Sequence, residues 1–149
     1  MPITYLPAED HVVRYIPWAR LRKDEDDNVI GVLGAAFRLR DDEDYLSATW
    51  AEYFAGSHAE RVAAAVRTIR ASKLNVTARS GFATGNVNGI KETCLADKGR
   101  HKIRIIHEPE DDNKAHTALR GWPRDNEDLL NLLADGVWSS FVLNKDIEA

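Results

Sequence analysis

The segment from Ser57 to Ser72, SHAERVAAAVRTIRAS, carries the clearest secondary-structure signal in this chain. Ser57 and Glu60 form the pattern of a capping box, in which the serine side chain accepts a hydrogen bond from the amide three residues on and the glutamate reaches back. Alanines fill the body of the segment and favour a helix. An apolar stripe follows at helical spacing: Val62, Val66 and Ile69. We therefore expect a helix over about 57–72.

Strands are expected before this helix, where β-branched and aromatic residues cluster between turn signals. They cover His11 to Ile16, Ala36 to Arg40 and Tyr45 to Trp50, and the last two are expected to pair as a hairpin across the acidic turn 41–44. The densely charged run from Arg22 to Asn28 is expected to be a loop, because it has no apolar periodicity.

After the helix, the expected order is a strand, a helix, a strand and two helices. We expect a strand over Val76 to Ala83, a helix over Val87 to Lys98, a strand over Lys102 to His107, a short helix over Lys114 to Arg120 and a helix over Asp125 to Leu143. This order is not a regular βαβ alternation, so the chain is expected to be α+β. We expect one globular domain over 1–149, with a mixed or antiparallel sheet packed against about four helices.

Composition restricts the classes of function. The net charge is −4 and the basic residues are dispersed among acidic ones, which argues against a nucleic-acid partner. No apolar run is long enough for a membrane span, and the first ten residues do not have the pattern of a signal peptide. The single cysteine, Cys94, fits a reducing compartment. A cytoplasmic location is expected.

A candidate site lies between His107 and His116, at the junction of an expected strand and an expected helix. The two histidines bracket an acidic loop that includes Asp111 and ends at Asn113, the expected helix N-cap. His107, His116 and Asp111 are candidate ligands of a divalent metal, because imidazole and carboxylate groups ligate such ions. Alternatively, one histidine is a general acid or base. The alternative without a chemical role is that this segment is a solvated loop or a helix cap.

Cys94 is a second candidate, as a nucleophile activated by a histidine. It lies four residues after Ile90 on the apolar face of the expected helix, where a cysteine behaves as a small hydrophobic side chain. Core packing is the favoured interpretation.

Two tryptophans beside prolines, Trp18 and Trp122, are candidate anchors of a protein interface. Burial is the favoured interpretation for each of them. With Asn113 in the acidic loop, they are the candidate binding residues of the chain.

Arg14, Ser47 and Glu52 resemble the arrangement of small ADP-ribosyltransferase-like domains, in which an early strand supplies an Arg or His, a later strand a Ser or Tyr, and a Glu completes the site. The resemblance implies NAD as a substrate, with Arg14 holding the pyrophosphate and Glu52 the ribose. Glu52 departs from that pattern, because it follows Ser47 closely instead of lying on a separate strand.

The whole chain also resembles a group of bacterial cytosolic proteins with no established activity. The resemblance rests on the segments Arg14 to Leu21, Leu46 to Glu52 and His107 to His116, and on Pro123-Arg124-Asp125. It implies a bacterial origin and assigns no catalytic residue.

From the sequence we expect a non-catalytic accessory module that binds another protein and needs no cofactor. The alternative is an enzyme. It is either a His- or metal-dependent hydrolase at the loop with His107 and His116, or an ADP-ribosyltransferase-like domain that uses NAD with Arg14, Ser47 and Glu52.

Overall fold

A six-stranded antiparallel sheet forms the centre of the computed structural model, which describes residues 2–149. Its strands are β1 (His11–Ile16), β4 (Tyr45–Trp50), β5 (Gly81–Asn86), β6 (Arg104–His107), β7 (His116–Arg120) and β8 (Ser140–Leu143). Their spatial order is β6-β7-β4-β1-β5-β8. The expected α+β class is therefore confirmed, with an antiparallel sheet.

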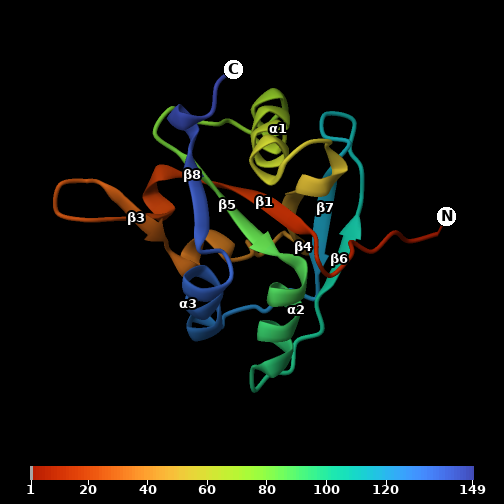
Figure 1. Ribbon diagram of the computed structural model, residues 1–149. Helices are drawn as coiled ribbons and strands as arrows, with labels where there is room; N and C mark the ends of the chain where they lie inside the picture. The colour runs from red at the N-terminus through yellow and green to blue at the C-terminus, as the bar shows by residue number, and fades with distance from the viewer. Residues whose placement is uncertain (1) are drawn as a thin grey trace.

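Helices cover both faces of the sheet (Figure 1). One face carries α1 (His58–Ala71), and the other carries α2 (Val87–Ala96), α3 (Glu127–Gly136) and the hairpin of β2 (Leu21–Lys23) with β3 (Val29–Val32). The alternation of side chains along β1 divides the core accordingly, since Val13 packs under α1 while Val12 and Ile16 belong to the larger opposite cluster. No helix within 2–149 has the length and apolar character needed to cross a membrane.

Helix α1 begins as its capping box predicts. The Glu60 amide donates to Ser57 Oγ at 3.2 Å, and the Ser57 amide donates to Glu60 Oε1 at 2.9 Å. Val62, Val66 and Ile69 are buried against the sheet. The expected strands at β1 and β4 and the expected helix at α2 are confirmed as well.

The expected helix over Lys114 to Arg120 is wrong, because this segment is β7, paired with both β4 and β6. Residues 116–119 are all buried, and a strand covered on both faces has no alternation of polar and apolar residues that would distinguish it from a helix. The expected C-terminal helix is also too long, since α3 ends at Gly136 and the edge strand β8 follows. The structure thus has three α-helices within 2–149, one fewer than expected.

Three further boundaries differ from expectation. Residues 34–37 form a 3₁₀ turn, so 36–40 is not the partner of β4 in a hairpin. The charged loop after Lys23 is the tip of the β2–β3 hairpin, which the sequence pattern did not indicate. Strand β5 begins only at Gly81, which pairs with Ile16, the last residue of β1.

Gly85 in β5 lies directly against the ring of Trp138, the largest fully buried side chain. A Cβ at Gly85 would stand 2.9 Å from Trp138 Cδ2. The ring is also packed on Phe37, with 4.8 Å between ring centroids, so it has no room to withdraw. Only glycine fits this position without a shift of the core.

Replacing Gly85 with alanine should destabilise the protein by about 1–3 kcal/mol, because it overpacks the core. Gly136→Ala is the matched control, since a Cβ there meets nothing within 4 Å. Urea unfolding followed by tryptophan fluorescence measures both variants. Equal stability of the two variants would contradict the packing argument.

Candidate active site

Strands β1 and β4 separate after two residue pairs, Val12 with Trp50 and Val13 with Thr49. On its other side β1 stays paired with β5 over all six residues. The second half of β1 is therefore joined to β5 but not to β4. The sheet is split between its two central strands at this end.

The side chain of Arg14 bridges the split. Its Nη1 donates to the carbonyl oxygen of Ser47 at 2.7 Å, and its Nε donates to the carbonyl oxygen of Ala36 at 3.1 Å. Within 2–149 no carboxylate lies within ion-pair distance of the guanidinium. Burial lowers the pKa of Arg14 to about 10, and the charge of Glu43 nearby acts in the opposite direction. The group stays cationic at neutral pH.

A cleft of about 990 Å³ opens at the split. Its walls come from β1, β4, the 3₁₀ turn 34–37 with the segment after it, the end of α1 and the loop 110–113. Arg14, Ser47, Thr49, Asn113 and His116 all line it. This volume suits a small organic molecule.

Ser47 and His116 are hydrogen-bonded to each other in the cleft, with Oγ 3.2 Å from Nε2. The other ring nitrogen of His116, Nδ1, lies 2.8 Å from the carbonyl oxygen of Glu108. A carbonyl oxygen only accepts, so Nδ1 carries a proton. In the neutral ring Nε2 is then free to accept the Ser47 proton, which is the arrangement of a nucleophile with its base and an orienting third group.

The loop from Glu108 to Asn113, whose Glu108 carbonyl oxygen orients His116, is itself held in place. Glu108 forms two hydrogen bonds with Arg120, at 2.7 and 2.8 Å. Asn113 is buried, donates to Thr49 Oγ1 at 2.9 Å and accepts from the Ala115 amide at 3.0 Å. Asn113 thus closes the loop against β4 and does not cap a helix as expected.

The predicted metal ligands His107, His116 and Asp111 are not brought together. His107 Nε2 donates to the Lys114 carbonyl oxygen at 2.8 Å, and its ring packs beside Trp50 and Tyr53. The Asp111 side chain is fully exposed. Among residues 2–149, one group of three side chains places its possible ligand atoms within 4.8 Å of one another, and it is a different one: His11, Glu52 and His58.

The set Arg14, Ser47 and Glu52 is brought together only in part. Arg14 contacts Ser47, but Glu52 does not line the cleft and pairs with His11. The link between Ser47 and His116, which belong to two different candidate sets, was not predicted. They are 69 positions apart in the sequence with no spacing signal, and only the pairing of β4 with β7 places them together.

The candidate interface anchors are covered. Trp122 is 4% exposed and donates through Nε1 to the Phe37 carbonyl oxygen, so it is a core residue. Trp18 is partly buried, with Lys23 and Arg79 stacked on its ring. Neither ring offers the bare aromatic surface expected of an interface anchor.

The comparisons with known proteins contain no match for this chain among family models, curated proteins or solved structures. Its chemistry is therefore inferred from the geometry of its own residues.

Cys94 is fully buried in the core, and this burial raises the pKa of its thiol to about 12. The thiolate needed for nucleophilic chemistry is therefore absent at neutral pH. The folded protein should resist labelling by a thiol reagent such as DTNB at pH 8. Protein unfolded in guanidinium should react at one thiol per chain. Rapid stoichiometric labelling of the folded protein would show that Cys94 is accessible.

The hydrogen bonds from Arg120 hold the pKa of the Glu108 carboxyl below its ordinary value. Such a group contributes stability above its unfolded pKa, about 4.3, and the contribution is lost as the pH falls through the folded pKa. Glu108→Gln should therefore cost about 0.5–1 kcal/mol at pH 7, since both side chains are about a third exposed. The difference from wild type should shrink below about pH 4.

Urea unfolding at pH 7 and at pH 3.5 measures this effect. Glu92→Gln is the control, because Glu92 is an exposed carboxylate with no ion pair in the described chain. A Glu108→Gln cost that persists unchanged at the lower pH would contradict the ion-pair explanation.

Proposed function

We propose that the protein is an enzyme that acts on a small anionic acyl compound, with Ser47 as nucleophile and His116 as its general base. The observation that carries this proposal is the hydrogen bond from Ser47 to a histidine whose tautomer is fixed by the Glu108 carbonyl oxygen, inside a cleft. A serine beside an oriented imidazole is the minimal arrangement for covalent acyl transfer.

The reaction proposed is ester hydrolysis through an acyl-enzyme. Ser47 Oγ attacks the substrate carbonyl carbon as its proton passes to His116 Nε2. The imidazolium then protonates the leaving alcohol as the ester C–O bond breaks. Water, deprotonated by the same nitrogen, attacks the acyl-serine, and the proton returns to Ser47 as the carboxylic acid leaves.

Two neighbouring charges support these steps. Glu110 Oε1 lies 3.8 Å from His116 Nε2, where its carboxylate stabilises the imidazolium formed midway through the reaction. Arg14 presents a cation at the cleft that no carboxylate of the described residues pairs with, and a planar guanidinium suits a carboxylate or phosphate on the substrate. We therefore infer a substrate that carries such an anionic group close to its ester.

The other functions expected from the sequence are less well supported. NAD chemistry of the ADP-ribosyltransferase kind would need Glu52 beside Arg14 and Ser47, and Glu52 lies outside the cleft lining. A protein-binding module stays a prediction, although Trp18 and Trp122 do not offer it exposed anchors.

A fluorophosphonate probe tests the proposed nucleophile, because it forms a stable adduct only with an activated serine. Intact-mass spectrometry should find one adduct per wild-type chain, with a labelling rate at least about 100-fold lower in Ser47→Ala and in His116→Gln. Ser140→Ala, an exposed serine on β8, should label like wild type. Circular dichroism melting confirms that each variant is folded.

Failure of the folded wild type to react would overturn the proposal. An adduct that persists in Ser47→Ala would equally exclude Ser47 as the nucleophile.

A further inference from the structure

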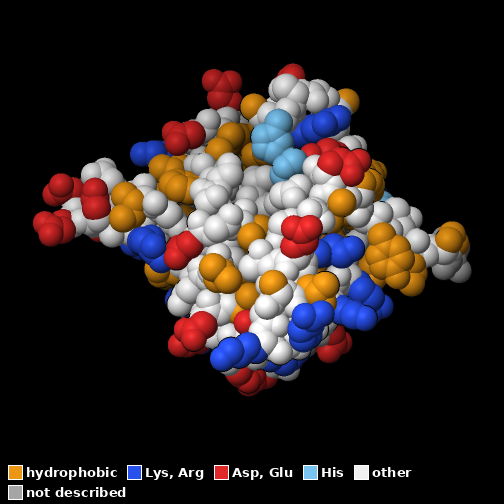
Figure 2. Space-filling view, turned by 60° about the horizontal axis from the view of Figure 1, so that its bottom comes forward, with side chains coloured by type: hydrophobic (Ala, Val, Ile, Leu, Met, Phe, Trp, Pro, Cys, Tyr) orange, Lys and Arg blue, Asp and Glu red, His pale blue; other side chains and the backbone are white. Residues whose placement is uncertain are grey.

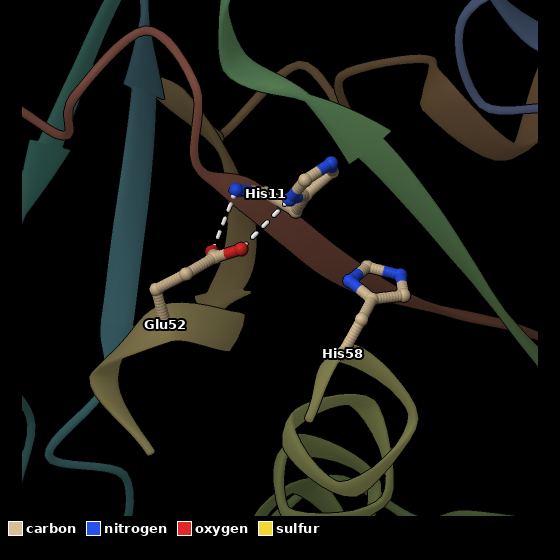
Figure 3. A group of neighbouring side chains, drawn as sticks. All are labelled: His11, Glu52 and His58. Carbon is tan, nitrogen blue, oxygen red and sulfur yellow. Dashed lines mark hydrogen bonds and ion pairs between the residues drawn. The ribbon is translucent and has the colours of Figure 1, made fainter. Parts of the chain in front are cut away.

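His11, Glu52 and His58 meet at the end of the sheet opposite the split (Figure 3). His11 is the first residue of β1, Glu52 lies in the 3₁₀ turn Ala51–Tyr53 that follows β4, and His58 is the first residue of α1. Three separate elements thus supply one side chain each. Figure 2 shows neighbouring histidine side chains exposed beside acidic ones on the face drawn.

Glu52 is fixed in place by His11. The His11 amide donates to Glu52 Oε1 at 2.7 Å, and His11 Nδ1 lies 2.7 Å from Glu52 Oε2. These two contacts hold the carboxylate in one orientation. The Glu52 side chain is 15% exposed. The His58 ring approaches His11 edge-on, with 4.9 Å between ring centroids.

We propose that His11, Glu52 and His58 bind a divalent transition-metal ion, with Zn²⁺ as the best match. Two imidazoles and one carboxylate are a common ligand set for zinc at about 2.0–2.2 Å. Their possible ligand atoms already lie within 4.8 Å of one another. An exposed His58 at a helix end needs only a side-chain rotation to close the remaining distance.

Binding requires the proton between His11 Nδ1 and Glu52 Oε2 to leave that position. In the neutral imidazole it moves to Nε2, so that Nδ1 is free to take the ion. Glu52 Oε1 keeps the hydrogen bond from the His11 amide, which orients the carboxylate as a supporting group does in known metal sites. Three protein ligands leave a fourth position for water, and the exposure of His58 gives solvent access to the site.

This site is independent of the proposed catalytic cleft. His58 begins α1, whereas the cleft is lined by Ile69 and the residues just after α1. The 14 residues of α1 separate them by about 20 Å at 1.5 Å per residue. The ion would tie β1, the end of β4 and α1 together, so we infer a structural role for it.

Isothermal titration of chelator-treated, desalted protein with ZnCl₂ at pH 7.5 tests the proposal. We expect one ion per chain and a Kd in the micromolar range or below. His58→Ala and Glu52→Gln should each weaken binding at least tenfold. His101→Ala is the matched control and should bind like wild type. His101 lies 3.5 Å from a carboxylate oxygen of Asp97, but among residues 2–149 it belongs to no group of three possible ligands.

Two further readouts keep the outcome independent of folding and of catalysis. CoCl₂ should produce visible d–d absorption in wild type and not in His58→Ala, and Zn²⁺ should raise the thermal midpoint of wild type and of His101→Ala but not that of His58→Ala. His58→Ala removes an exposed side chain, so its metal-free stability should stay near that of wild type. Absence of a stoichiometric Zn²⁺ signal, or binding that survives both site variants, would overturn the proposal.

Discussion

The Arg14 guanidinium is the interaction on which the cleft depends, because it occupies the place of a missing β-ladder. Where β1 and β4 part, the carbonyl oxygens of Ser47 and Ala36 accept hydrogen bonds from Arg14. Two N–H groups of one side chain satisfy both, so neither of these two carbonyl oxygens is left unpaired. A neutral side chain of similar length would leave at least one acceptor without its partner. The sheet therefore opens at this place and stays closed between β1 and β5.

The register between β4 and β7 places Ser47 and His116 next to each other at this opening. Thr49 pairs with His116 and Ser47 with Ala118, so Ser47 and His116 are diagonal neighbours on the α1 face of the sheet. A slip of one residue would turn Ser47 to the opposite face and separate it from the imidazole. The register is fixed by the buried Leu46 and Leu119 pair on the other face, and Asn113 closes the loop at the wall of the cleft. Packing on one face thus determines hydrogen bonding on the other.

Local signals in the sequence predicted the elements that depend on local physics. The capping box at Ser57 and Glu60 fixed the start of α1, and the β-branched run at 11–16 identified β1. The segment 114–120 was misassigned because its burial on both faces comes from neighbours far away in the chain. A related reason explains why the sequence pattern grouped Glu52 with Arg14 and Ser47. In an antiparallel pair, a residue just after β4 lies beside the first residue of β1, so Glu52 meets His11 and not Arg14.

The two faces of the sheet differ in role: one carries the larger apolar core, and the other carries the polar candidate sites. The larger core, with Trp138 and Phe37, lies on the face opposite α1 and buries most of the apolar side chains. The smaller core under α1 includes Val62, Val66 and Ile69 of that helix. Polar side chains gather near both ends of α1: His58 with Glu52 at its start, and the cleft with Ser47 and His116 beyond its end. Because the opposite face supplies most of the hydrophobic stabilisation, polar groups on the α1 face are tolerated at little cost to the fold.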